Sequence, residues 1–278
     1  MTQIYPNGAG ESLGHWLATN SPLYLSGNLW YVDSTNGVDA ASPAGQNRNK
    51  PLKTLGQALT NIAARDVIVL MDNFAETFTS LVTVSKQCAI VGAGSSGGKP
   101  TAKLTNNQSG TGGLLDITAG DVLLGNLWIE ENLHTTANTT ARINVANSSF
   151  RMEDCYVECG IDDAGPAVLL AGGSERSTIQ NTTFIVTSTD TANQPESAIK
   201  NTAVALSNIH LIDVTVDGGV AGFSNFHAID FSASDIAPIY VKNLSLLRGA
   251  DLKLSSSVGT VGFVNVSKQT GSARVEWP

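Results

Sequence analysis

A short pattern that recurs about every 30 residues constrains the fold of this chain more than any other feature. An Asn or Asp stands in nearly identical surroundings five times, at intervals of 28, 27, 32 and 30 residues: Asn126, Asp154, Asn181, Asp213 and Asn243. The residues at relative positions −4, −2, +1 and +3 are apolar in eighteen of twenty cases, the exceptions being Ser177 and Thr182. A repeat of this length is typical of solenoids, in which one structural unit stacks on the next.

The spacing of the apolar positions predicts two short strands that meet at a bend. Side chains alternate between the two faces of a strand, so residues that point inward recur at even spacing. Here the spacing is even on each side of the Asn or Asp and odd across it. Asn and Asp adopt the left-handed backbone conformation more readily than other non-glycine residues, so we expect them to form the bend. Stacked bends are expected to hydrogen-bond through their side chains.

The rest of the chain extends the same architecture. A weaker copy centres on Asn265, with Lys268 at its last inward position, and residues 67–70, 82–84, 88–91 and 114–117 read as earlier short strands. Thr54 is a candidate N-cap for a helix over residues 55–64 that covers the N-terminal end. We therefore expect an all-β, right-handed parallel β-helix with a short N-terminal capping helix. The expected organisation is a lead or docking segment, residues 1–30, followed by a single β-helix domain, residues 31–278.

Charge and cysteine content narrow the classes of function. The net charge of −8 and the scattered basic residues argue against nucleic-acid binding, which needs clustered Lys and Arg. No run of about 18 apolar residues is present, so we expect no insertion into a membrane. The N-terminus lacks the pattern of a signal peptide, so we expect the chain to be made in a cytoplasm and not to be exported through a signal peptide. The odd count of three cysteines, without a CxxC pair, favours reduced, buried thiols.

Between Trp30 and Gly94 an extended segment, a helix that follows a proline, a buried strand and a glycine turn occur in a fixed order. The pieces are residues 31–37, 50–55, 66–70 and 89–92. This order resembles the opening of pectin-lyase-like right-handed parallel β-helix proteins. The resemblance covers about a quarter of the chain. It implies a family of polysaccharide lyases, hydrolases and epimerases that also includes non-catalytic and sugar-binding spikes of bacteriophages, so the fold alone does not select a function.

Candidate catalytic groups are few. Sugar-cleaving β-helices need paired carboxylates, or a calcium ion held by carboxylates with a basic residue nearby. Asp162 and Asp163 resemble the adjacent aspartates of polygalacturonases, but the Gly-His-Gly and Arg-x-Lys of that pattern have no counterpart, and a solvated turn is favoured. Glu130 and Glu131 could join them in a calcium site, although an exposed acidic turn is favoured there too.

The histidines also carry no clear chemistry, because His15, His134, His210 and His227 lack metal-ligand spacing. His134 is a candidate surface contact, and His210 should point outward between two inward residues. We therefore assign no catalytic residue, no metal ligand and no cofactor.

An outward stripe suggests assembly. We assign Trp128, Tyr156 and Ile185 to one stacked position on successive rungs, and a contiguous apolar stripe usually marks an interface. A homotrimer would bury it. The alternative is that the loop of residues 132–142 or the N-terminal lead covers the stripe within one chain.

The leading interpretation is a non-enzymatic structural protein of a bacteriophage virion. It would be a head decoration, a fibre subunit or a small tail spike that contacts other virion proteins, and it could also bind the host surface or a glycan. The absence of a signal pattern and the Gly-, Asn- and Thr-rich composition favour this interpretation. A polysaccharide lyase or hydrolase of the same fold is the alternative, and a carbohydrate-binding bacterial adhesin is a third.

Overall fold

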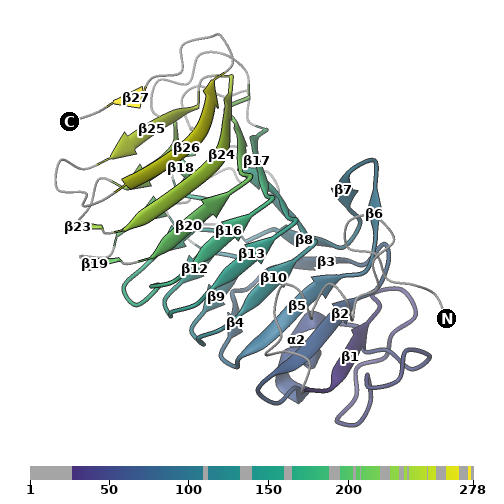
Figure 1. Cartoon of the computed structure of the whole chain (residues 1–278). Coiled ribbons are helices and arrows are strands. Elements are labelled where there is room, and N and C mark those ends of the chain that lie inside the picture. Colours follow the sequence, from purple (N-terminus) through teal and green to yellow (C-terminus); the bar gives the residue numbers. More distant parts are fainter. Residues whose placement is uncertain are drawn as a thin grey trace.

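The computed structural model is a right-handed parallel β-helix, as the repeat predicted (Figure 1). It describes residues 27–108, 112–131, 140–159, 165–187, 195–202, 205–206, 208–219, 226–231, 235–236, 238–248, 250–254, 261–268 and 275–276. Strands of successive rungs pair in parallel, and the repeat positions lie opposite each other, for example Leu124 with Met152 and Met152 with Ile179. Each rung therefore places its apolar residues directly above those of the rung before.

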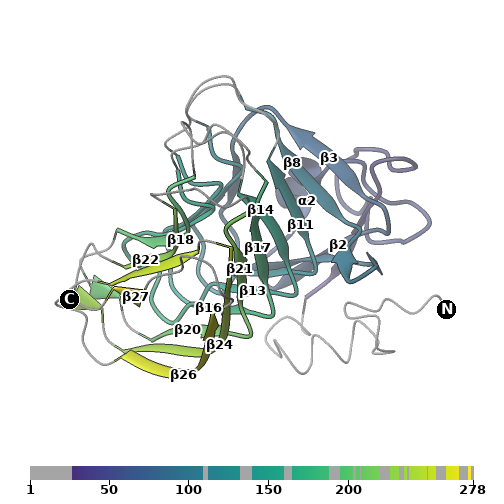
Figure 2. The same cartoon turned by 90° about the horizontal axis from the view of Figure 1, so that it is seen from above.

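The solenoid has three faces. The first is formed by β1 (Leu29–Val32), β2 (Asp66–Leu70), β5 (Cys88–Gly92), β10 (Leu123–Gly125), β13 (Arg151–Glu153), β16 (Thr178–Gln180) and β20 (Ile209–Ile212). The second is formed by β3 (Ala75–Phe78), β8 (Lys103–Asn106), β11 (Trp128–Glu131), β14 (Tyr156–Cys159), β17 (Thr183–Val186) and β21 (Thr215–Asp217). Two longer strands, β24 (Ile239–Leu247) and β26 (Val261–Lys268), run through the bend and belong to both faces (Figure 2).

The third face is a separate eight-stranded sheet. Its strands are β4 (Val82–Val84), β9 (Leu115–Ile117), β12 (Ile143–Val145), β15 (Val168–Leu170), β18 (Ser197–Asn201), β22 (His227–Phe231), β25 (Asp251–Leu254) and β27 (Val275–Glu276). Two short pairs lie outside the faces: the antiparallel hairpin of β6 (Ser95–Ser96) and β7 (Lys99–Pro100), and the parallel pair of β19 (Ala205–Leu206) and β23 (Asp235–Ile236).

The bend between the first and second faces is formed by the repeated Asn and Asp residues. Their φ angles lie in the left-handed region, between 45° and 55°: Asn126, Asp154, Asn181, Asp213, Asn243 and the weaker copy Asn265. All twenty predicted inward side chains of the five strong copies are buried. The two polar ones are satisfied locally, because the hydroxyl of Ser177 donates to the carbonyl of Ser174 and that of Thr182 donates to the carbonyl of Gln180.

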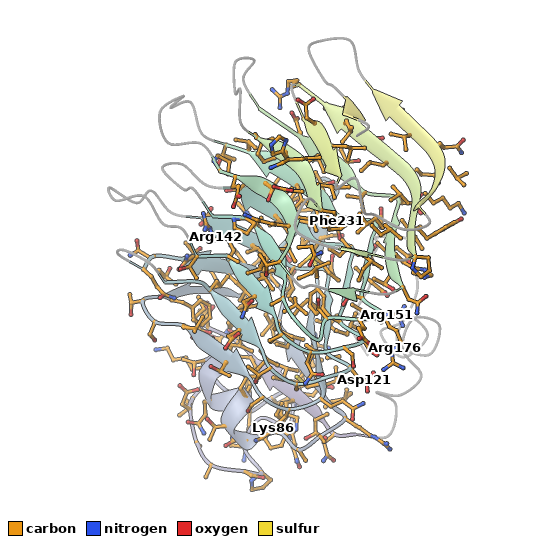
Figure 3. All side chains as sticks on the ribbon, turned by 90° about the vertical axis from the view of Figure 1, so that its left-hand side faces the viewer. Lys86, Asp121, Arg142, Arg151, Arg176 and Phe231 are labelled. Atoms are coloured by element: carbon orange, nitrogen blue, oxygen red, sulfur yellow. The ribbon has the colours of Figure 1, made fainter. Side chains whose placement is uncertain are left out.

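The capping helix, α2 (Leu55–Asn61), is shorter than the sequence predicted and ends three residues before Ala64. Thr54 is its N-cap, and Leu55 and Ala58 are buried in the core. Lys86 caps the C-terminal end of the helix, because its ammonium group donates to the carbonyls of Leu59, Thr60 and Ile62 (Figure 3). No helix in the described ranges is long and apolar enough to cross a membrane.

The N-terminal edge is fixed by a buried carboxylate. Asp66 accepts hydrogen bonds from the Asn28 amide, the Trp30 indole and the Ala63 amide at 2.7, 2.7 and 2.8 Å. Asp66 therefore ties β1, the end of α2 and β2 together. The expected lead of residues 1–30 overlaps β1 at its last two positions, and residues 1–26 lie outside the described part of the chain.

Candidate functional site

The β6–β7 hairpin lies against the second face of the solenoid, beside the bend. Two glycines form the tip of the hairpin, Gly97 and Gly98, with φ of 61° and 82°. The hairpin base is held where Thr101 donates to the carboxylate of Asp72 at 2.7 Å. The turn thus leads into β7, which places Lys99 on the second face.

Lys99 anchors the hairpin on two aromatic rings. Its Nζ lies 3.1 Å from the ring centroid of Trp128 and 4.0 Å from that of Tyr156, and 3.1 Å from Oε1 of Glu158. The indole of Trp128 donates to the same carboxylate oxygen at 3.0 Å. The two rings meet edge to face, with centroids 6.4 Å apart. A cation above aromatic faces, with a carboxylate beside it, fixes the hairpin in place.

The outward stripe differs from the prediction at one residue. Trp128 pairs with Tyr156, and Tyr156 pairs with Thr183, so Thr183 continues the column. Ile185 follows its bend residue by four positions rather than two, and it lies in the next column, opposite Glu158. The assignment of Ile185 to the stripe was therefore wrong. Trp128 and Tyr156 are half-buried, partly because Lys99 covers them. Of the two suggested covers, the loop of residues 132–142 and the N-terminal lead of residues 1–30, the parts at 132–139 and 1–26 lie outside the described residues.

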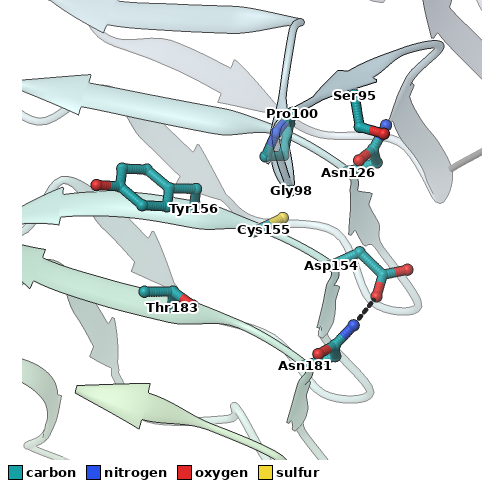
Figure 4. Close-up of a pocket in the computed structure, with 9 residues that line it drawn as sticks. All are labelled: Ser95, Gly98, Pro100, Asn126, Asp154, Cys155, Tyr156, Asn181 and Thr183. Atoms are coloured by element: carbon teal, nitrogen blue, oxygen red, sulfur yellow. Dashed lines mark hydrogen bonds between the residues drawn. The ribbon is translucent and has the colours of Figure 1, made fainter. Parts of the chain in front are cut away.

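A cavity of about 270 Å³ opens between the hairpin and the bend (Figure 4). It is lined by Ser95, Gly98 and Pro100 of the hairpin, by Asn126, Asp154 and Asn181 of the bend, and by Cys155, Tyr156 and Thr183. Most of these residues are polar. The sequence did not predict this site, because it depends on the hairpin that folds back over a distant rung.

The bend residues in the cavity are held by hydrogen bonds. Asn181 donates from Nδ2 to Oδ1 of Asp154 at 2.5 Å. Asn126 donates from Nδ2 to the carbonyls of Gly92 and Gly94, at 2.9 and 3.0 Å, and thereby binds the base of the hairpin. The thiol of Cys155 contacts the backbone carbonyl of Glu153. Burial raises the pKa of this thiol to about 12. A thiol of this kind is not a nucleophile near neutral pH.

Three carboxylates of the second face are paired with basic groups. Glu130 accepts from Lys103 and from the hydroxyl of Thr105, at 3.0 and 2.8 Å. Asp217 accepts from both Nε and Nη2 of Arg248. Together with the Lys99–Glu158 pair, these contacts hold three carboxylates in fixed ion pairs.

The other candidates from the sequence are distributed as follows. Asp162, Asp163, His15 and His134 lie outside the described residues, as does the side chain of Glu131. His210 points outward, as predicted, and its ring lies 5.7 Å from that of Tyr240. The three cysteines are buried and unpaired, as predicted. Within the described ranges, no group of three or more His, Cys, Asp or Glu could hold a metal ion.

Comparison with known proteins supports the fold. No protein-family model matches the chain, and neither does a curated protein. Among solved structures, the chain is similar to a rhamnogalacturonan lyase, with a TM-score of 0.50 and 10% identity, over 90% of this chain and 66% of that one. It is also similar to pectate lyase Pel9A, with a TM-score of 0.43 and 11% identity, over 90% of this chain and 78% of that one. At such identity the likeness concerns the fold, and the fold of this chain is that of the pectin-lyase-like parallel β-helices.

Proposed function

We propose that the chain is a non-enzymatic structural protein of a bacteriophage virion, either a head decoration or fibre subunit or a small tail spike. In this proposal the lateral surface of the β-helix binds a glycan of the host surface and does not cleave it. The chain is made in the host cytoplasm and becomes part of the extracellular particle.

The ion pairing of two carboxylates on the second face supports the proposal that the chain is not an enzyme. Cleavage of a glycosidic bond needs a carboxyl group or another base that is free to move a proton at the scissile bond. Glu130 and Glu158 are instead held by Lys103 and Lys99 at 3.0 and 3.1 Å. Each lysine neutralises the carboxylate that it contacts, and the second one also fixes the hairpin. These groups serve packing and rigidity, which suit a structural rod.

The proposal includes a homotrimer. Trp128 and Tyr156 remain partly exposed on the outer side of the second face, although Lys99 lies above them. Partly exposed aromatic rings on a rigid sheet are typical of protein interfaces. Three-fold symmetry is a common way to bury such surfaces and would also suit attachment to a symmetric particle.

The second candidate function is a polysaccharide lyase or hydrolase. The likeness to the fold of a rhamnogalacturonan lyase favours it, and Asp162 and Asp163 remain its candidate acidic pair. In that case the chemistry would lie at residues 162–163, which follow β14 in the sequence.

Incubation with polysaccharides separates the two functions. The purified chain is mixed with polyuronides and with bacterial capsule polysaccharides, and the products are assayed for new reducing ends and for unsaturated sugars. We expect neither product. Formation of either one, lost when Asp162 and Asp163 are both replaced by Asn, would establish the enzyme instead. Mass spectrometry of purified phage particles from cells that carry the gene tests the virion location, and absence of the chain from the particles would contradict it.

A further inference from the structure

We propose that the cavity under the β6–β7 hairpin binds one neutral, hydroxyl-rich sugar residue of a glycan. This inference rests on the proposed glycan contact and assigns it a place, at the bend between the first and second faces. The cavity volume of about 270 Å³ lies near the lower end of the range for small-molecule pockets. It therefore suits a single sugar ring, with the rest of a chain outside.

The polar groups of the lining match the hydroxyl groups of a sugar. Asn181 uses one amide N–H for Asp154, and its second N–H and its Oδ1 make no hydrogen bond to another described residue. The hydroxyls of Thr183 and Ser95 are likewise without a partner among the described residues. Amide and hydroxyl groups together offer donors and acceptors. A sugar hydroxyl is both, so one ring can satisfy several of these groups at once.

The site is also preorganised. The bond to Asp154 fixes the amide plane of Asn181, and the bonds of Asn126 to Gly92 and Gly94 fix the floor below the hairpin. Side chains that are already ordered lose little conformational entropy when a ligand binds.

The charge of the lining selects against other ligands. Asp154 is the acidic residue among those that line the cavity, and the lining residues include no Lys, Arg or His, so they offer no cation to a uronate, a phosphate or another anion. Lys99 does not supply that cation, because its ammonium group lies between the two aromatic rings and Glu158. A calcium ion takes six to eight oxygen ligands, usually with several carboxylates, and one carboxylate is a poor basis for such a site. A neutral sugar is the ligand class that remains.

The repeat supplies matched controls. Asn243 makes the same bend bond as Asn181, donating to Asp213 at 2.6 Å, but it does not line the cavity. Thr215 stands in the same column as Thr183, one rung further on, and is also outside the cavity. Glycine tolerates the left-handed backbone, so Asn181→Gly and Asn243→Gly both remove a bend side chain and its bond to an aspartate. Asn243→Gly also removes the acceptor of Asn265, so it is the stricter control for structural damage. Thr183→Val and Thr215→Val remove one hydroxyl each while keeping the shape.

The experiment is isothermal titration of the full chain and these four variants with neutral oligomers of glucose, galactose and N-acetylglucosamine, and with oligogalacturonate. We expect a neutral oligomer to bind, Asn181→Gly and Thr183→Val to weaken it by about tenfold or more, and the two control variants to bind like the unaltered chain. The inference is overturned if no neutral oligomer binds, if oligogalacturonate binds more tightly, or if all four variants behave alike. Failure of the proposed function is a separate result, because it shows as cleaved products or as absence from particles.

Discussion

Asn181 donates a hydrogen bond from its side-chain amide to the carboxylate of Asp154, one rung earlier, at 2.5 Å. The same relationship recurs two rungs on, where Asn243 donates to Asp213 at 2.6 Å, and Asn265 then donates to Asn243 at 3.1 Å. Bend residues thus do two things. They adopt the left-handed conformation that turns the chain, and they connect one rung to the next outside the core.

These two roles are separable at Asp213. Replacing it by Gly removes the acceptor for Asn243 but keeps a backbone that tolerates φ of 54°, so we expect a loss of about 1 kcal/mol. Asp213→Val adds left-handed strain of about 1–2 kcal/mol, more for a β-branched residue, and should be clearly the less stable variant. Urea unfolding of both variants measures the difference. Equal free energies of unfolding for the Gly and Val variants would mean that a β-branched side chain does not strain the left-handed backbone at this bend.

The bend could be predicted because core packing and backbone conformation both restrict the residue types within the same short repeat. The inward positions must be apolar and the turning residue must tolerate positive φ, so the pattern and the residue type repeat together. The corner between the third and the first faces has no such repeated residue type. Residues with positive φ also precede the strands of the first face, but they share no chemical type: Asp121, Ser149, Arg176 and Asn208.

The cavity could not be predicted for a different reason. A repeat predicts what each rung has in common, whereas the hairpin of residues 95–100 is an insertion in a single rung. Its contacts with Trp128 and Tyr156 depend on side chains 29 and 57 residues after Lys99, which no local pattern connects. The error at Ile185 arose from counting: the residue has the outward parity of Tyr156 but stands two residues further along its strand.

The inward register makes a direct prediction about stability. Leu127 and Val214 are both 0% exposed, and an aspartate at either position would bury an unpaired charge inside a rung. We expect Leu127→Asp and Val214→Asp to abolish cooperative unfolding or to prevent folding. Thr35→Asp, at an exposed turn, should change the free energy of unfolding by less than about 0.5 kcal/mol. Similar melting of all three variants and the unaltered chain, followed by circular dichroism, would contradict the assigned register.

The anchor of the hairpin predicts its local dynamics. Lys99→Ala removes the cation over Trp128 and Tyr156 and the partner of Glu158, interactions worth about 1 kcal/mol at a half-exposed site. We expect amide hydrogens of residues 95–101 to exchange about fivefold faster, with little change elsewhere. Lys103→Ala is the control, since Lys103 also lies near Trp128 but belongs to β8. Unchanged exchange in Lys99→Ala would show that other contacts hold the hairpin.

The proposed trimer predicts a mass and its dependence on two residues. Multi-angle light scattering should give three times the chain mass of 29.0 kDa at micromolar concentration. Replacing both Trp128 and Tyr156 by Ser should yield monomers, since the partly exposed aromatic column would be lost. Ile185→Ser lies in the neighbouring column and tests how far the interface extends. A monomeric mass for the unaltered chain would remove the trimer from the proposal.

Glu153 predicts how stability depends on pH. Its side chain is 3% exposed and lies 2.5 Å from the guanidinium of Arg151. Burial raises the pKa of this carboxyl above its ordinary value, and the charge of Arg151 offsets only part of that effect. Because the folded-state pKa is the higher one, the folded chain binds the proton more tightly than the unfolded chain. The stabilisation from the protonated group is complete below the unfolded pKa, near 4.5, and is lost as the pH rises through the folded pKa.

Glu153→Gln keeps the shape of the side chain and is neutral at every pH, so the variant does not lose stability as the pH rises. We expect its melting temperature, relative to that of the unaltered chain, to rise as the pH is increased from 4 to 7. Thermal unfolding of both proteins at several pH values in this window measures the trend. Glu175→Gln, at an exposed position, is the control for removal of a negative charge from an acidic chain. A relative melting temperature that falls toward pH 7 would mean that the ion pair with Arg151 outweighs the burial of the carboxylate, and that Glu153 stabilises the rung in its charged form.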